Sequence, residues 1–188
     1  MRISTAFVPK RLKGDPKPWV RFGSGKSEYK RWAPEICGIC CLKMLGDTFH
    51  RTNNLSLYAL TMWCLGKGGF KILPDNRIEG VFHQPLLELA KELGLDGWFG
   101  KLDQNSVIKV LGQQKFVILS IDLKKVNLNL AGSHLVLIHT YRLPHNIFIA
   151  HDPSFVLSKE GRNTKIEADY LDFLSNHKGI VLWPKSDG

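Results

Sequence analysis

EICGICCLKML, residues 35–45, is the stretch of the sequence that decides the fold. From Cys37 onward its apolar residues recur at positions i, i+3, i+4, i+7 and i+8, which is the spacing of a helix with one buried face. We therefore expect a helix that begins near Cys37 and carries this thiol on its inward side. At the start of a helix the unpaired backbone amides and the helix dipole stabilise a thiolate, so this position favours a reactive cysteine.

Two motifs that could bind a cofactor are incomplete. Residues 37–41 carry three cysteines, but a zinc site usually takes two separated pairs of ligands, and the sequence offers only the lone Cys64 and scattered histidines as a second pair. Residues 23–27 (GSGKS) resemble a phosphate-binding loop, but Val20 stands where that loop needs a glycine. We expect no metal and no cofactor, and we interpret Cys40, Cys41 and Cys64 as small buried residues.

Length and composition indicate one soluble domain. The chain has 188 residues, of which 44% are hydrophobic, and this is enough for one well-buried core. The first residues lack the apolar stretch of a signal peptide, and no run approaches the roughly 18 apolar residues of a membrane span. We expect a domain at residues 31–188, preceded by a basic segment at residues 1–30, and a cytoplasmic location in which the thiols stay free.

The positive charge is concentrated at the start of the chain. Residues 1–31 hold nine Lys or Arg and two acidic residues, which gives +7 of the formal net charge of +9. Three prolines between residues 9 and 18 favour an extended course for this segment. It is either a solvated, partly extended lead-in to the domain or an arm that meets an acidic partner, a nucleic acid or a membrane surface. We favour the lead-in, because no amphipathic helix accompanies the charge, and we do not expect a nucleic acid as the partner.

The order of the elements predicts an α+β fold. The sequence is mainly helical at residues 31–112, whereas residues 113–188 contain short β-branched and aromatic runs that are typical of antiparallel strands. Besides the cysteine helix, we expect helices at residues 55–65 with Asn54 as the cap, at residues 85–93 with Pro85 in first position, and from Asp103 to residue 111. The expected strands cover residues 116–121, 133–141, 146–151 and 179–183.

A histidine and a carboxylate lie on neighbouring expected strands. His134 begins the second strand and Asp152 follows the third, so any pairing with an even residue sum places both side chains on one face. They are then directly opposite or, for a sum of 288, diagonal at about 7 to 8 Å. His139 and His151 fall on the other face, which leaves His134 as the candidate base. Cys37, His134 and Asp152 are the groups of a thiol nucleophile site.

These residues carry a family resemblance. Cys37-Gly38 at the start of an apolar helix, GSHLVLI at residues 132–138 and IFIAHDP at residues 147–153 resemble, in order and approximate spacing, the C39-type branch of the papain-like cysteine peptidases. The resemblance covers roughly residues 31–183. It implies a papain-like fold in which Cys37 is the nucleophile, His134 the general base and Asp152 the residue that orients the histidine. It also implies a peptide or protein substrate, a thioester intermediate and no cofactor.

The sequence departs from this family at one position of the oxyanion site. Family members place a glutamine a few residues before the cysteine, and residues 30–35 (KRWAPE) contain none. The backbone N–H of Cys37 is the remaining donor, and we expect Arg31 or the indole of Trp32 as the second. A cysteine peptidase is the first reading. A deamidase or transglutaminase-type acyl transferase with the same triad, and a weakly active or inactive domain that binds an extended peptide, stay open.

Overall fold

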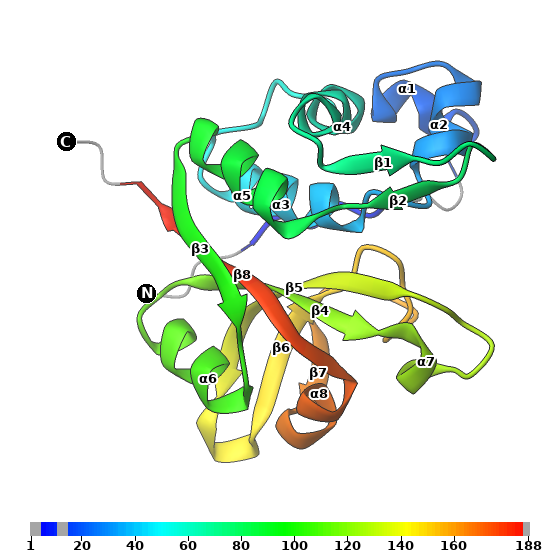
Figure 1. The fold of residues 1–188 in the computed structure, drawn as a ribbon. Coiled ribbons are helices and arrows are strands. Elements are labelled where there is room, and N and C mark those ends of the chain that lie inside the picture. Colours follow the sequence, from blue (N-terminus) through cyan, green and yellow to red (C-terminus); the bar gives the residue numbers. More distant parts are fainter. Residues whose placement is uncertain (1–4, 11–14, 186–188) are drawn as a thin grey trace.

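The protein folds into two packed halves (Figure 1), shown by a computed structural model that describes residues 5–10 and 15–185. The helices are α1 (Pro18–Phe22), α2 (Lys26–Trp32), α3 (Cys37–Thr48), α4 (Leu57–Gly66), α5 (His83–Glu92), α6 (Gln104–Gly112), α7 (Leu123–Val126) and α8 (Ala168–Leu174), with a 3₁₀ turn, η1, at Leu143–His145. Within the described ranges no helix is both long and apolar enough to cross a membrane.

An antiparallel sheet of six strands forms the second half. Its strand order is β3-β8-β4-β5-β6-β7, and a separate two-stranded ribbon, β1-β2, lies with the first five helices. The strands are β1 (Phe70–Ile72), β2 (Ile78–Gly80), β3 (Leu95–Lys101), β4 (Phe116–Asp122), β5 (Ser133–Arg142), β6 (Ile147–His151), β7 (Thr164–Glu167) and β8 (Ser175–Pro184). The expected α+β class and the four expected strands are confirmed.

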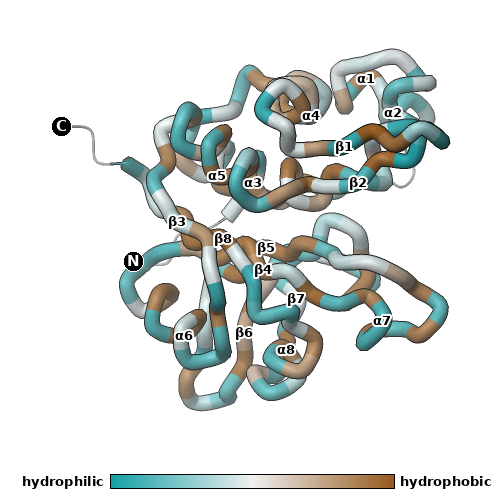
Figure 2. Tube along the Cα trace, in the orientation of Figure 1, coloured by the Kyte–Doolittle hydropathy of each residue, from teal (hydrophilic) through white to brown (hydrophobic). Residues whose placement is uncertain are grey.

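The two central strands are buried on both faces, which explains their continuous apolar sequence. In β5, Leu135 and Leu137 belong to a core shared with α3, α4 and α5, whereas Val136 and Ile138 belong to a second core with α6 and α8. Figure 2 shows the same apolar character along β4 and β5, where the helical half meets the sheet. The sheet therefore separates two hydrophobic cores, one on each of its faces. Helix α3 packs directly on β5.

Two helices start where the sequence predicted, whereas the expected cap of α4 and the expected start of α5 were wrong. α3 begins at Cys37 as expected, and the side chain of Asp103 accepts the Ser106 N–H at 2.7 Å ahead of α6. Asn54 is not the cap of α4, because the hydroxyl of Ser56 accepts the Ala59 N–H at 3.1 Å. α5 begins at His83, two residues earlier than expected, so Pro85 falls within the first turn, where its missing N–H is not needed.

The boundary between the halves also differs from the expected residue 112. Strand β3 pairs with β8 along its whole length, and α6 packs on β4 and β5, so both elements belong to the sheet half. The sequence of β3 (LDGWFGK) has two glycines and few β-branched residues. A strand was therefore not predicted there. Its place at the edge of the sheet tolerates such a sequence, since only one side needs a partner.

The basic N-terminal segment does not take the extended course that we expected throughout. Residues 18–22 and 26–32 form α1 and α2, and Pro18 stands at the first position of α1, where proline favours a helix. Phe22 and Trp32 are buried in the core of the helical half. The described residues of this segment, 5–10 and 15–30, are therefore part of the folded domain, and contact with an acidic partner stays untested.

Gly38 lies where α3 meets the sheet, in a space that admits no larger side chain. A Cβ at this position would collide with Val81 and lie 2.8 Å from Leu135 and 2.9 Å from Leu86. We expect Gly38→Ala to lower the free energy of unfolding by about 1–3 kcal/mol, because the helix or its neighbours must move. Urea unfolding followed by circular dichroism measures the change.

Gly66→Ala is the matched control at the end of α4. An added Cβ there meets no atom within 4 Å, so we expect an unchanged or slightly higher stability. Equal stabilities of the two variants would contradict the close approach of α3 to β5.

Candidate active site

Cys37 stands at the first position of α3, where the helix leaves its N–H groups unpaired. The first bond of the helix runs from the Cys40 N–H to the Ile36 carbonyl, so the N–H of Cys37 has no acceptor within the helix. Cys37 is only 7% exposed, yet it lines a cleft of about 520 Å³ between residues 80–83 and the sheet. The thiol is thus shielded from bulk water and still faces a space that a substrate could enter.

The structure brings His134 and Asp152 together. Around the site the β5-β6 register pairs Leu137 with His151, a residue sum of 288, so the diagonal arrangement is the one found. The register shifts at a bulge beyond Ile138. His134 Nε2 lies 2.7 Å from Asp152 Oδ1, and the two residues are 2% and 0% exposed.

Three donors surround the Asp152 carboxylate. Besides His134, the Ser154 N–H donates to Oδ1 at 2.9 Å and the Leu157 N–H donates to Oδ2 at 2.7 Å. Burial raises the pKa of this carboxyl, but the hydrogen bond and charge of His134 and the two backbone N–H groups outweigh it, so the pKa lies below its usual value. Asp152 is therefore a buried anion whose negative charge is compensated.

The imidazole of His134 lies close enough to the Cys37 thiol for each group to shift the pKa of the other. Since Nε2 faces Asp152, Nδ1 is the ring nitrogen left for the thiol, and the Ser154 hydroxyl lies 3.4 Å from it. Burial raises the pKa of the Cys37 thiol, but His134, the Leu135 backbone and the Lys10 charge reverse this and leave it below the usual value. Burial lowers the pKa of His134, and its two partners raise it to about 9. The arrangement favours a thiolate-imidazolium pair.

The other three cysteines lie in a different environment. Cys40, Cys41 and Cys64 are fully buried in the core of the helical half, as their interpretation as core residues requires. Burial raises the pKa of the Cys64 thiol to about 12 and raises those of Cys40 and Cys41 further still. Cys37 is therefore chemically distinct from its neighbours on the same helix.

The cleft beside Cys37 has polar and apolar walls. Asn176 Nδ2 donates to Ser133 Oγ at 3.0 Å and to Ser120 Oγ at 3.2 Å. These bonds join β8, β5 and β4, and the three residues line the cleft. On the helical side Phe82 is 44% exposed and also lines the cleft. The sequence analysis missed Asn176, because a lone Asn at the start of a strand carries no motif.

The structure uses the side chains of Arg31 and Trp32 elsewhere. The Trp32 indole N–H donates to Glu28 Oε2 at 3.0 Å, and its buried ring packs against Phe70. Arg31 is exposed and lies over the Trp32 ring, 5.6 Å from its centroid. Neither residue lines the cleft of Cys37, so the expectation that one of them donates to the oxyanion finds no support here.

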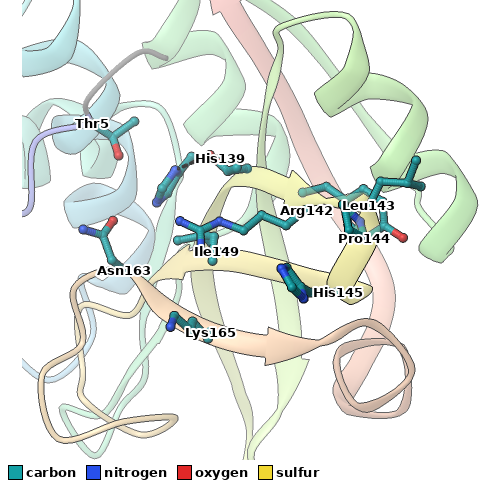
Figure 3. Close-up of a pocket in the computed structure, with 11 residues that line it drawn as sticks. Thr5, His139, Arg142, Leu143, Pro144, His145, Ile149, Asn163 and Lys165 are labelled. Atoms are coloured by element: carbon teal, nitrogen blue, oxygen red, sulfur yellow. Dashed lines mark hydrogen bonds between the residues drawn. The ribbon is translucent and has the colours of Figure 1, made fainter.

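A larger cavity, of about 790 Å³, lies away from this site (Figure 3). It is lined by residues of β5, η1, β6 and β7, together with Thr5. His139 and Arg142 on β5 and Lys165 on β7 face it, whereas Cys37, His134 and Asp152 are absent from its lining. The triad candidates and this cavity are thus separate features of the structure.

Comparison with known proteins shows the fold. No protein-family model and no curated protein matches the chain. A double glycine motif protease from an AMS/PCAT transporter, solved in complex with the leader peptide, is 14% identical with a TM-score of 0.58 over 98% of this chain and 94% of that one.

Two further solved structures agree. The peptidase domain of Streptococcus ComA, a bifunctional ABC transporter involved in quorum sensing, is 17% identical with a TM-score of 0.55 over 81% of this chain and 93% of that one. A C39-like peptidase from Bacillus anthracis is 14% identical with a TM-score of 0.55 over 80% of this chain and 90% of that one. The chain has the papain-like fold of the C39 peptidase domains, as its sequence resemblance implied.

The pair of His134 and Asp152 makes stability depend on pH. Because the pKa of His134 is raised to about 9, the stabilisation of its protonated form is complete below its unfolded pKa of about 6.5 and is lost as the pH rises towards 9. We expect Asp152→Asn to lower the free energy of unfolding by about 3–5 kcal/mol near pH 6 and by clearly less near pH 9. Urea unfolding at both pH values measures the difference.

Asp169→Asn removes an exposed carboxylate in the first turn of α8 and is the control. Its effect is expected to be small and equal at the two pH values, because no titrating partner faces it. A loss for Asp152→Asn that is also independent of pH would contradict the ion pair.

Proposed function

We propose that this protein is a cysteine peptidase in which Cys37, His134 and Asp152 form a catalytic triad. The observation that carries the proposal is the buried pair of His134 and Asp152, joined at 2.7 Å, beside a Cys37 thiol whose pKa His134 lowers, at the edge of a cleft. A nucleophile, a base and a group that orients the base are what acyl transfer requires. The fold shared with C39 peptidase domains supports the same assignment.

The residues can perform each proton transfer of peptide hydrolysis. The Cys37 thiolate attacks the carbonyl carbon, and as the tetrahedral adduct collapses, the His134 imidazolium gives its proton to the leaving amine while the C–N bond breaks. A thioester to Cys37 remains. His134, now neutral, takes a proton from water, the hydroxide attacks the thioester, and the S–C bond breaks to release a carboxylic acid. Asp152 holds the imidazole in orientation and stabilises its charged form.

The oxyanion is held at the start of α3 in this mechanism. The backbone N–H of Cys37 has no acceptor within the helix and is the donor we assign. The helix dipole adds a favourable field for the negative charge. Since the side chains of Arg31 and Trp32 are used elsewhere, we expect hydrolysis slower by about 10²- to 10³-fold than in an enzyme with a second donor.

The substrate that fits the cleft is an extended peptide. Its walls combine the exposed ring of Phe82 with the polar groups of Asn176, Ser120 and Ser133, a mixture that suits a backbone with side chains. One protein of the same fold was solved with a leader peptide bound. We take a peptide as the substrate class for this chain on the combined grounds of fold and cleft.

The test is whether Cys37 forms an acyl intermediate. Incubation with a mixture of unrelated peptides, followed by mass spectrometry of the acid-quenched protein, is expected to show an acyl group on Cys37 and two peptide fragments in solution. Cys37→Ser and His134→Ala are each expected to reduce fragment formation by at least about 10³-fold. Cys64→Ser, which removes a core thiol of raised pKa, is the matched control and retains the activity.

Other products would identify the alternatives. Conversion of a glutamine side chain to glutamate, or its linkage to an added amine, with no fragments, would replace the peptidase by a deamidase or a transglutaminase-type acyl transferase. Saturable peptide binding without any adduct on Cys37, together with an alkylation rate of Cys37 no higher than that of Cys64, would leave a peptide-binding module.

A further inference from the structure

The N-terminal residues 5–10 lie across the two halves of the molecule beside the triad candidates (Figure 1). We refer to this segment as the clasp. Its residues contact the loop that carries Asp152 on one side and both ends of α3 on the other, although more than 100 positions of sequence separate the two partners. The proposed mechanism gives it no role.

On the sheet side the clasp holds the residues that flank Asp152. The Thr5 hydroxyl lies 2.8 Å from His151 Nε2, and the Phe7 ring packs edge-on against His151 at 5.4 Å between centroids. The Lys10 N–H donates to the Pro153 carbonyl at 3.0 Å. His151 and Pro153 are the direct neighbours of Asp152 in the chain, so the clasp contacts the residue before this carboxylate through its side chain and the residue after it through its backbone.

On the helical side the clasp brackets α3. The Ala6 N–H donates to Thr48 Oγ1 at 2.9 Å, at the last residue of the helix. The Lys10 ammonium donates to the Pro34 carbonyl at 2.7 Å, three residues before Cys37. Lys10 alone thus joins the loop after β6 to the loop before α3. Its two hydrogen bonds hold the backbone directly after Asp152 and the backbone three residues before Cys37.

Lys10 also places a positive charge close to the thiol. Its ammonium is near enough to lower the pKa of Cys37 and, against the larger effect of burial, that of Glu35. Among the described residues no carboxylate lies within salt-bridge distance of Lys10, and the half-buried Glu35 is a carboxylate on which its charge acts. A half-buried cation acts on a buried anion with little screening by salt.

Besides Lys10, several other charged or titratable groups surround Cys37, and they lie on the different elements that pack against it. His134 on β5 is its direct partner, and the neighbouring thiols on α3 stay neutral because burial raises their pKa. The remaining groups precede α3 or line the cleft, and they are Glu35, His83 and Lys178. Lys10 is the member of this set that also fixes backbone on both sides of the site.

We propose that the clasp holds the thiol and the imidazole at a fixed separation and that Lys10 is a positioning residue that favours the thiolate form of Cys37. The inference deepens the proposed function, since it assigns a role within the same site. It concerns the ionisation of the thiol, which can be measured whether or not the protein cleaves any peptide.

The first test is the pH profile of Cys37 alkylation by iodoacetamide, located by mass spectrometry. Lys10→Met is expected to move the midpoint of the profile to higher pH and to slow alkylation near pH 6 by roughly three- to tenfold, because the thiolate loses a nearby cation. Lys10→Arg keeps the charge and is expected to restore the profile of the unmodified chain. A Lys10→Met profile with an unchanged midpoint would overturn the role of Lys10.

Two further variants separate charge from folding. Lys17→Met removes an exposed charge from the same basic segment and is expected to leave the midpoint unchanged. Lys10→Gln can still donate to the Pro34 carbonyl but carries no charge, so it is expected to shift the midpoint even if Lys10→Met fails to fold. An equal shift for Lys17→Met would assign the effect to net charge and reject the proposal.

The second test concerns the fastening of the Asp152 loop. Phe7→Ala removes the ring that packs on His151, and we expect it to speed hydrogen exchange of the Ser154 and Leu157 amides about tenfold, since they donate to the carboxylate. Unchanged exchange at both amides would show that the clasp does not hold this loop. Peptide cleavage enters neither test, so absence of peptidase activity with shifted midpoints would reject the proposed function and leave this inference standing.

Discussion

The structure depends on how one buried carboxylate is compensated. Asp152 has no exposed surface, and an isolated ion in such a place is strongly unfavourable. Its oxygens therefore need the His134 ring and the two backbone N–H groups that follow in the loop. The β5-β6 register and the turn after β6 bring these donors to the carboxylate, and the carboxylate in turn raises the pKa of the imidazole. The thiol at the start of α3 then meets a histidine that is already held in place.

The two halves contribute different things to the site. The helical half supplies a thiol at a helix start and the N–H groups that surround it, whereas the sheet half supplies the imidazole and the carboxylate. Gly38 lets α3 approach β5 closely enough for the two sets to touch. Residues of the basic N-terminal segment contact both halves beside the site. Sequence composition alone would have assigned this segment to the surface.

The sequence predicted what local patterns determine. The apolar spacing after Cys37 located α3, the β-branched runs located the central strands, and the alternation of faces selected His134 over His139 and His151. What it missed depends on contacts between distant residues. The strand β3 exists because β8 offers it a partner, the bulge beyond Ile138 shifts a register that pairing alone would continue, and the indole of Trp32 is used by a glutamate one turn earlier in α2. Asn176 enters the cleft wall only after β8 has joined the sheet.

The span of sequence that the site covers has a consequence for biosynthesis. The Cys37 thiol and the groups that act on it, directly or through His134, lie at residues 10, 37, 134 and 152, and a further donor to Asp152 lies as late as Leu157. Contacts of such separation in sequence form slowly and late in folding. While the chain is being made, Cys37 emerges from the ribosome long before its base. Before His134 and Lys10 have reached it, the Cys37 thiol lacks the contacts that lower its pKa, so the lowered pKa is a property of the completed tertiary structure.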